Sequence, residues 1–560
     1  MKKKLISCML ATVMVVSCLS GCGNQTQGEE ANTSNVNEET SASTASTSTA
    51  SSEVEEIKLG YPIEGDVTLT IAIPVDPSLQ ARAKDISETA GGKLWQEKTG
   101  INLEVVTYAD TTALNLLITS GELPDIICGH LETAYPGGPT AAVEDGVIQP
   151  ITDYMQYAPN LQAFMDSDPT AYKDSLTGNG EIAGFLSMSS TENKNLMCTR
   201  GMLLRKDLLD KVGMDVPKSA DDLYNVLKAF KEQLNVQYPL TTQSTFVIND
   251  LLKEGGFTSP FNLVKGDFYV KDGKVHYGFY ENEMKDALAF LNKLVDEELL
   301  NPNYTSIDGN AVTSDMVNGV SAMTVHYASR AYIWPNAAEE ANIEGYEIIG
   351  VAPLQTADGQ IAMSGQYVNS RTYGGYITTS CENIEAAVRF LDWGYNTENA
   401  LLFAYGVEGI TYRIDENGLV ETHLEEETKL HPDWTQAEVN SYYKLAASNS
   451  APYMSPLADY PELMTEDVQR MYDARDQYKI MTAEDYYLPK LTAFISEEDN
   501  AEIADLMGDI NTYRDETVTK FILGTESLDN FAEYQKVLKD MGIETVIELY
   551  QKALDKYYQY

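Results

Sequence analysis

Cysteine is scarce in this chain of 560 residues, which contains six. Three of them lie within the first 22 residues, so the body of the protein keeps only Cys128, Cys198 and Cys381. Three widely separated cysteines provide neither a disulfide framework nor a zinc-binding cluster. We therefore predict buried free thiols and no structural disulfide, although one bridge among the three would also suit an oxidising compartment.

Basic residues are also in short supply, because 39 lysines and arginines stand against 85 aspartates and glutamates. The formal net charge at pH 7 is −46. A chain this acidic repels nucleic acid and anionic lipid, which excludes a nucleic-acid-binding protein. The acidity favours solubility and indicates no particular partner.

Catalytic and metal-binding motifs are missing as well. The five histidines form no helical metal-binding pair, and the sequence has neither a Gly-x-Ser-x-Gly turn nor a phosphate-binding Gly-Lys-Ser/Thr loop. Acidic pairs are so frequent that none can be assigned as glycosidase carboxylates. Residues 415–418 predict a hairpin turn and residues 166–169 a helix cap or turn, not calcium loops. The sequence therefore predicts no catalytic residue, no metal ligand and no cofactor.

Only one long apolar run occurs, from Leu5 to Val16, and three lysines precede it. The run is too short to span a bilayer and has the length of a signal-peptide core. Residues 19–22 (LSGC) then match a bacterial lipobox, in which residues 1–21 are removed and Cys22 becomes the lipidated N-terminus. An ordinary secretory signal that happens to carry a cysteine is the alternative. We expect a protein anchored by lipid on the extracytoplasmic face of the cell membrane.

Large apolar side chains are almost absent from residues 22–56, which are rich in Ser, Thr, Asn and Glu. Such a segment cannot bury enough surface to offset the entropy lost on ordering. We predict a disordered tether with a root-mean-square reach of roughly 30 Å.

The residues that follow, 57–560, predict two or more lobes, because one hydrophobic core seldom serves about 500 residues. Strands expected over 67–74, 101–108 and 124–129 alternate with helices over 79–99 and 111–121, which predicts an α/β unit with a parallel sheet. A second α/β unit begins near Asn195, with a helix starting at 205–207 and another capped by Ser219. The tail from about 483 is predicted to be helical.

The crossings between lobes are expected near 155–190 and near 318–323, which indicates a hinge. These crossings predict the boundaries 57–160 (first part of lobe 1), 161–317 (hinge crossing and first part of lobe 2), 318–395 (return of lobe 1) and 396–560 (return of lobe 2 and C-terminal helices). Ligands of such sheets bind beyond the carboxyl ends of the strands, here at Asp76, Asp110 and residues 129–135.

Aromatic residues give the best indication of ligand chemistry, because 35 tyrosines far outnumber 14 phenylalanines. A tyrosine combines a ring face, which can stack on the C–H face of a sugar, with a hydroxyl group that can hydrogen-bond to it. Trp334, Arg371, Tyr373 and Tyr376 are therefore candidate ligand contacts. By contrast, Trp95 and Trp393 are predicted to anchor helices in the core.

The chain resembles the family 1 extracellular solute-binding proteins of ABC importers, especially the large lipoprotein branch of Gram-positive bacteria. The resemblance is carried by the lipobox and by residues 95–105, 120–127, 203–231, 318–323, 406–412 and 513–535. It implies a two-lobed α/β fold, similar to the type II periplasmic binding proteins, with hinge-crossing strands and a helical C-terminal region. The lobes of such proteins close on the ligand, and the importer recognises the closed form.

The resemblance also implies where the ligand is contacted, namely at Asp76, within 130–135 and within 327–334. With the aromatic candidates and Arg200, the predicted ligand-binding residues are Asp76, His130, Glu132, Tyr135, Arg200, Tyr327, Trp334, Arg371, Tyr373 and Tyr376. We expect a monomer that captures an extracellular oligosaccharide and delivers it to the permease subunits of an ABC importer. A peptide or another small solute bound by the same fold is the main alternative, and a surface sensor or an enzyme is the third.

Overall fold

The computed structural model describes residues 59–188, 200–243, 251–252, 256–361, 370–422, 425–478 and 488–559. Cys22 and Cys198 lie outside these residues, as does the predicted tether. No helix of the described residues is long and apolar enough to cross a membrane. The described residues belong to one compact unit, Leu59–Tyr560.

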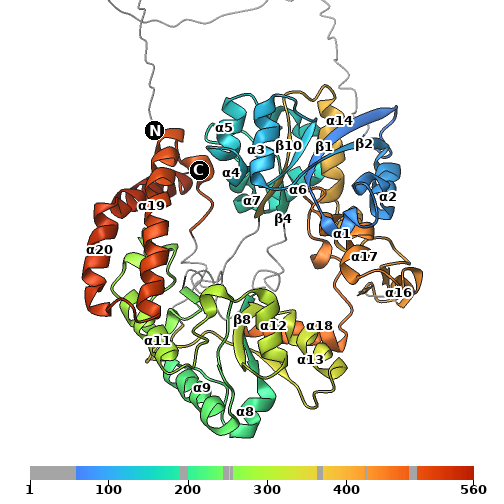
Figure 1. Cartoon of the computed structure of the whole chain (residues 1–560). Coiled ribbons are helices and arrows are strands. Elements are labelled where there is room, and N and C mark those ends of the chain that lie inside the picture. Colours follow the sequence, from blue (N-terminus) through green and yellow to red (C-terminus); the bar gives the residue numbers. More distant parts are fainter. Residues whose placement is uncertain are drawn as a thin grey trace, which may run out of the picture. The chain divides into compact units, whose positions relative to one another are not determined.

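The first lobe is built on a five-stranded sheet with the order β2-β1-β3-β10-β4 (Figure 1). Its strands are β1 (Val67–Pro74), β2 (Ile101–Tyr108), β3 (Ile126–Gly129), β4 (Phe185–Met188) and β10 (Ser370–Ile377). β1 pairs parallel with β2 and β3, whereas β10 runs antiparallel to β3 and β4. The predicted parallel α/β unit is therefore confirmed, with one antiparallel strand inserted from far along the chain.

Burial follows the position of each strand. The inner strand β1 buries Leu69, Ile71 and Ile73, whereas the edge strand β2 alternates buried Ile101 and Leu103 with exposed polar residues. This alternation is typical of a strand with one face on the core.

The helix predicted over 79–99 is instead broken into three short pieces. These are α1 (Pro77–Gln80), a 3-10 turn (Ile86–Glu88) and α2 (Ala90–Thr99). Asp76, Asp85 and Thr89 each cap the piece that follows, accepting hydrogen bonds from its first amides. Short polar side chains of this kind start new helices rather than continue an old one, because they bind nearby backbone amides.

The first lobe also contains helices from several parts of the chain. They are α3 (Thr111–Ser120), α4 (Leu131–Ala134), α5 (Gly138–Glu144), α6 (Pro159–Ser167), α7 (Pro169–Asp174), α14 (Ile384–Asp392), α15 (Thr397–Ala404), α16 (Glu425–Leu430) and α17 (Gln436–Tyr443). The predicted helix cap is confirmed, since Asp168 caps α7. So is the predicted hairpin, which joins β11 (Tyr412–Ile414) to β12 (Val420–Thr422) through a turn organised by Asp415.

The second lobe has a three-stranded antiparallel sheet with the order β8-β5-β9. Its strands are β5 (Arg200–Arg205), β8 (Met323–Tyr327) and β9 (Ile348–Val351), and a separate hairpin contains β6 (Phe268–Lys271) and β7 (Lys274–Tyr277). Its helices are α8 (Lys206–Val212), α9 (Ala220–Leu234), α11 (Met284–Asp296), α12 (Gly309–Val317), α13 (Arg330–Glu340) and α18 (Glu466–Tyr478). As predicted, Ser219 caps α9, in a capping box with Asp222.

The predicted boundaries of the return segments are wrong. Because β8 pairs with β5, residues 318–361 belong to the second lobe, and the chain returns to the first sheet only at β10. Residues 396–454 stay with the first lobe, where Met454 bridges Met188 of β4, before the chain reaches α18, which packs on β9. A short apolar strand suits either sheet, so its local pattern does not identify its pairing partner.

The predicted C-terminal helices are present as α19 (Glu497–Ile522), α20 (Phe531–Asp540) and α21 (Ile543–Tyr557), drawn in red in Figure 1. They pack against the second lobe, where Arg514 donates to the Tyr277 hydroxyl at 2.9 Å and Asn292 donates to the Ile522 carbonyl at 3.1 Å. At the C-terminal end of α21, the Lys173 side chain of the first lobe donates to the Tyr557 carbonyl at 3.0 Å.

The predicted core anchors are confirmed. Trp95 is fully buried and stacks on Phe390 with ring centroids 4.3 Å apart, and Trp393 is also buried. Cys128 and Cys381 are buried free thiols, as expected.

Candidate functional site

Asp76 lies directly after β1, as predicted, but both of its carboxylate oxygens serve the protein itself. Oδ1 accepts from the amides of Ser78 and Leu79 at 2.8 and 3.3 Å, and Oδ2 accepts from the Ser448 hydroxyl at 2.9 Å. The side chain therefore caps α1 and ties it to the segment after α17. Ligand contact at Asp76 stays a prediction.

His130 and Tyr373 are brought together because Gly129 at the end of β3 pairs with Gly374 of β10. The two rings meet edge to face with centroids 5.3 Å apart. His130 is exposed, whereas Tyr373 is buried and donates its hydroxyl to the Asn449 carbonyl. Burial raises the pKa of Tyr373 well above its usual value, so its hydroxyl remains a donor. His130 can present its ring to a ligand, with Tyr373 as its support.

Glu132 on α4 is nearly buried and forms an ion pair with Lys490, at 2.8 Å between Oε1 and Nζ. Its Oε2 atom and the Tyr376 hydroxyl have no hydrogen-bond partner among the described residues. Tyr376 is fully buried in the sheet, and burial, with the charge of Glu132, raises its pKa well above the usual value. Its ring is part of the core and offers no face to a ligand.

Tyr135 and Arg371 complete the first-lobe candidates. The Tyr135 hydroxyl donates to Asp145 at 2.6 Å, and burial and this bond raise its pKa to about 12. Tyr135 is thus engaged within the first lobe. Arg371 lies in β10, but its side chain is outside the described part of the structure.

In the second lobe, Arg200 of β5 and Tyr327 of β8 are cross-strand partners. The guanidinium carbon lies 5.2 Å from the centre of the Tyr327 ring, and this tyrosine is 43% exposed. The neighbouring His326 is buried, and its Nδ1 accepts from the Tyr327 amide at 2.8 Å. Burial and the charges of Arg330 and Arg200 lower the pKa of His326 to about 4, so it is neutral at physiological pH.

The structure places Trp334 in the core of the second lobe and not on a ligand-binding surface. Its side chain is fully buried, and its indole N–H donates to the Thr313 hydroxyl at 3.3 Å. Its position on α13 turns the ring toward α12, where apolar residues pack around it. We therefore leave Trp334 out of the candidate site.

Sequence reasoning missed a further group of polar residues, here called the Glu462 group. Its members share partial or full burial and mutual electrostatic influence, and they are Arg330, Tyr332, Tyr405, Lys444, Glu462, Tyr472 and Arg475. Within the described residues, none of these side chains forms a hydrogen bond with another. No local motif marks them, because they come from α13, α18 and three connecting segments.

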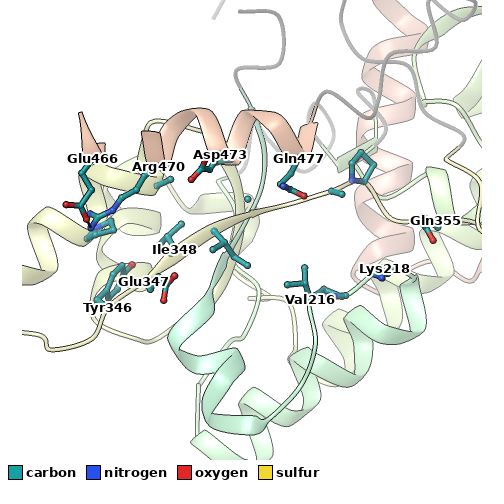
Figure 2. A pocket seen from close by; sticks show the side chains of 18 residues that line it. Val216, Lys218, Tyr346, Glu347, Ile348, Gln355, Glu466, Arg470, Asp473 and Gln477 are labelled. Carbon is teal, nitrogen blue, oxygen red and sulfur yellow. Dashed lines mark hydrogen bonds and ion pairs between the residues drawn. The ribbon is translucent and has the colours of Figure 1, made fainter. Parts of the chain in front are cut away.

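The structure also has a cavity of about 730 Å³ in the second lobe, between α18, β9 and residues 216–218 (Figure 2). The exposed face of α18 forms one wall, with Glu466, Arg470, Asp473 and Gln477. Arg470 is already paired with Glu466 at 2.5 Å. The cavity contains none of the predicted ligand-binding residues. Among the described residues, no group of three or more His, Cys, Asp or Glu side chains could hold a metal ion.

Residues 74–401 match the family model described as bacterial extracellular solute-binding protein. The chain belongs to this family. It is thus a solute-binding protein of the class that serves ABC transporters, and the prediction of a binding protein rather than an enzyme is confirmed.

Similar proteins agree with this assignment. The lipoprotein LipO of Bacillus subtilis is 28% identical over 353 residues, which are 60% of this chain and 66% of LipO, just under two thirds of that relative. The fructooligosaccharide ABC transporter substrate-binding protein FusA of Streptococcus pneumoniae is 23% identical over 551 residues, covering 89% of this chain and 92% of FusA.

A solved structure shows the same fold at low sequence identity. It is an HMO-binding, ABC-transporter-associated solute-binding protein of Bifidobacterium longum infantis, with a TM-score of 0.71 and 17% identity over 88% of this chain and 99% of that one. The predicted two-lobed α/β fold of this solute-binding protein is therefore confirmed.

Proposed function

We propose that this solute-binding protein captures an oligosaccharide outside the cell and delivers it to the permease of an ABC importer. The observation that carries the proposal is Tyr327, an exposed ring with a guanidinium beside it at the edge of β5 and β8. An exposed aromatic face stacks on the C–H face of a pyranose or furanose, and an adjacent arginine donates to ring hydroxyls. β5 begins where the chain enters the second lobe, so Tyr327 lies next to a crossing between lobes.

The names of the relatives support a sugar ligand. FusA is a fructooligosaccharide-binding component, and the Bifidobacterium protein is HMO-binding. His130, exposed beside Tyr373, offers a second polar ring in the first lobe. Two rings of this kind, one in each lobe, suit a ligand with several sugar units.

We also propose that Cys22 carries a lipid and holds the protein on the outer face of the membrane. The proposal rests on the lipobox at residues 19–22 and on the similarity to a protein named as a lipoprotein. Two acyl chains are sufficient for stable attachment.

The ligand class can be tested by thermal unfolding of residues 57–560 with a panel of oligosaccharides, amino acids and short peptides. We expect an intact oligosaccharide to raise the melting temperature, since binding to the folded state alone adds about 2.7 kcal/mol at a hundredfold excess over Kd. Stabilisation by peptides alone would favour the peptide alternative, and degraded ligand would indicate an enzyme.

The role of Tyr327 can be tested in the same assay with Tyr327→Ala. We expect the variant to lose roughly fivefold in sugar affinity, because stacking of a ring on a sugar is worth about 1 kcal/mol. Tyr558→Ala is the matched control, since Tyr558 is 62% exposed near the C-terminus. Equal affinity of the Tyr327 variant and wild type would exclude this ring from the site.

A further inference from the structure

Glu462 lies on the segment that leads from the first lobe to α18, and its backbone is held in place by the β11–β12 hairpin. The Val420 amide donates to the Pro461 carbonyl at 2.9 Å, and the Leu463 amide donates to the Val420 carbonyl at 2.7 Å. The two bonds flank Glu462, which forms a parallel bridge with Val420. The position of this carboxylate is therefore set by hydrogen bonds on both sides.

Two cations act on Glu462 from opposite parts of the chain. Lys444 follows α17 of the first lobe, and Arg475 lies in the last turn of α18 in the second lobe. Burial raises the pKa of Glu462, although Arg475 and Lys444 oppose this, and burial lowers the pKa of Lys444 against the pull of Glu427 and Glu462. Glu462 and Lys444 are therefore both short of compensating charge.

The charges are close enough to influence one another, yet they are not paired. In the described part of the chain, neither Lys444 nor Arg475 lies within 4.0 Å of a carboxylate oxygen, and no hydrogen bond reaches the Glu462 carboxylate. The Nε atoms of Arg330 and Arg475 are buried without a hydrogen-bond partner among these residues. Buried ionic groups without partners are costly, and a ligand that bonds to them offsets this cost.

Three tyrosines complete the surroundings. The Tyr405 hydroxyl is buried and lacks a partner among the described residues, and the Tyr472 ring lies 5.4 Å from the Arg475 guanidinium. Burial and the charge of Glu462 raise the pKa of Tyr472, and burial with Asp467 and Glu462 raises that of Tyr332. All three hydroxyls therefore stay protonated and can both donate and accept.

We propose that Glu462, Lys444 and Arg475 form a subsite for one uncharged sugar unit, in which Glu462 accepts from one ring hydroxyl and a cation donates to its neighbour. This proposal rests on the proposed function. A hydroxyl group can donate and accept, so a pair of adjacent hydroxyls satisfies a carboxylate and a cation together. The negative charge of a uronate would be repelled by Glu462, with Glu427 and Asp467 nearby. The positive charge of an ammonium group would be repelled by Lys444, Arg475 and Arg330.

The test is calorimetric titration of Glu462→Gln with the oligosaccharide that stabilises wild type and with a matched oligosaccharide containing a uronic acid. Because hydrogen bonds to charged groups are the strong ones, we expect a loss of roughly tenfold to a hundredfold for the neutral sugar. Glu421→Gln is the control, since Glu421 is next to Val420 but pairs with Arg413. Lys444→Met provides a second variant from another segment, in case the first one unfolds.

A pH series adds a readout that a structural role would not change. Wild-type affinity should fall as the pH drops through the raised pKa of Glu462, whereas Glu462→Gln should lack this decline. The other charged groups in these surroundings, Lys444, Arg330, Arg475, Glu427 and Asp467, and the three tyrosines are the same in both proteins, so the comparison isolates Glu462.

Unchanged affinity of both variants would overturn the subsite and leave the proposed function standing. Tighter binding of the uronate by wild type would overturn the uncharged class. If no sugar stabilises wild type, the proposed function itself fails.

Discussion

His326 and Tyr327 are neighbours in β8, and their side chains have opposite environments, as expected for successive residues of a strand. His326 is 4% exposed and Tyr327 is 43% exposed. The buried imidazole accepts from a backbone amide at Nδ1, and a proton that it gained would add a positive charge beside Arg330 and Arg200. The exposed ring, by contrast, is available for contact.

The low pKa of His326 predicts a pH-dependent stability. Its pKa is about 4 in the folded protein, below the value of about 6.5 in an unfolded chain. The stabilisation from keeping this histidine neutral is complete above about pH 6.5 and is lost as the pH falls toward 4, by up to about 3 kcal/mol. His326→Asn, which keeps an acceptor for the Tyr327 amide, should reduce this loss in urea unfolding at pH 7 and pH 4. His130→Asn is the control, because His130 is exposed; an unchanged pH profile of the His326 variant would contradict the prediction.

At the scale of elements, helix α18 lies between the Glu462 group and the cavity of Figure 2. It approaches β9 so closely that a Cβ atom on Gly350 would lie 2.6 Å from the Ala474 Cα and 2.7 Å from its carbonyl oxygen. The next residue, Arg475, belongs to the Glu462 group, and the opposite face of α18 lines the cavity of Figure 2. The contact at Gly350 therefore determines where Arg475 lies.

Gly350→Ala should displace α18, because backbone atoms are the neighbours that would have to move. We expect a loss of about 1–3 kcal/mol in the free energy of unfolding, typical of overpacking. Gly508→Ala is the matched control, since Gly508 lies inside α19 with nothing within 4 Å of an added Cβ. That variant should gain about 0.5–1 kcal/mol, because alanine is the better helix former. Equal effects of the two substitutions in urea unfolding would show that α18 can move without a loss in the free energy of unfolding.

At the scale of the whole molecule, the chain passes from the first lobe to the second between β4 and β5, returns between β9 and β10, and leaves the first lobe again before α18. Arg200 begins β5, and Glu462 lies on the last of these passages. Residues near these crossings lie close to both lobes. A ligand held between the lobes of a hinged protein would be contacted there.

The proposed lipid anchor predicts where the complete protein resides. Cys22→Ser removes the thiol that would carry the lipid, so we expect the variant to be released into the medium, whereas wild type stays with the membrane fraction. Fractionation of cells that express each form, with metabolic labelling by a fatty acid, measures both effects. Residues 57–560 should fold equally well in the two forms, and membrane retention of the variant would contradict the anchor.

The sequence by itself determined the features that depend on neighbouring residues. The bounds of β1 and β2, the cap at Ser219, the hairpin turn at Asp415 and the burial of Trp95 all follow from patterns a few residues long. Only the tertiary structure decided the partner of β8, the burial of Trp334 against α12 and the assembly of the Glu462 group. These depend on contacts between segments far apart in the chain, and a local pattern holds no information about which distant surface will cover it.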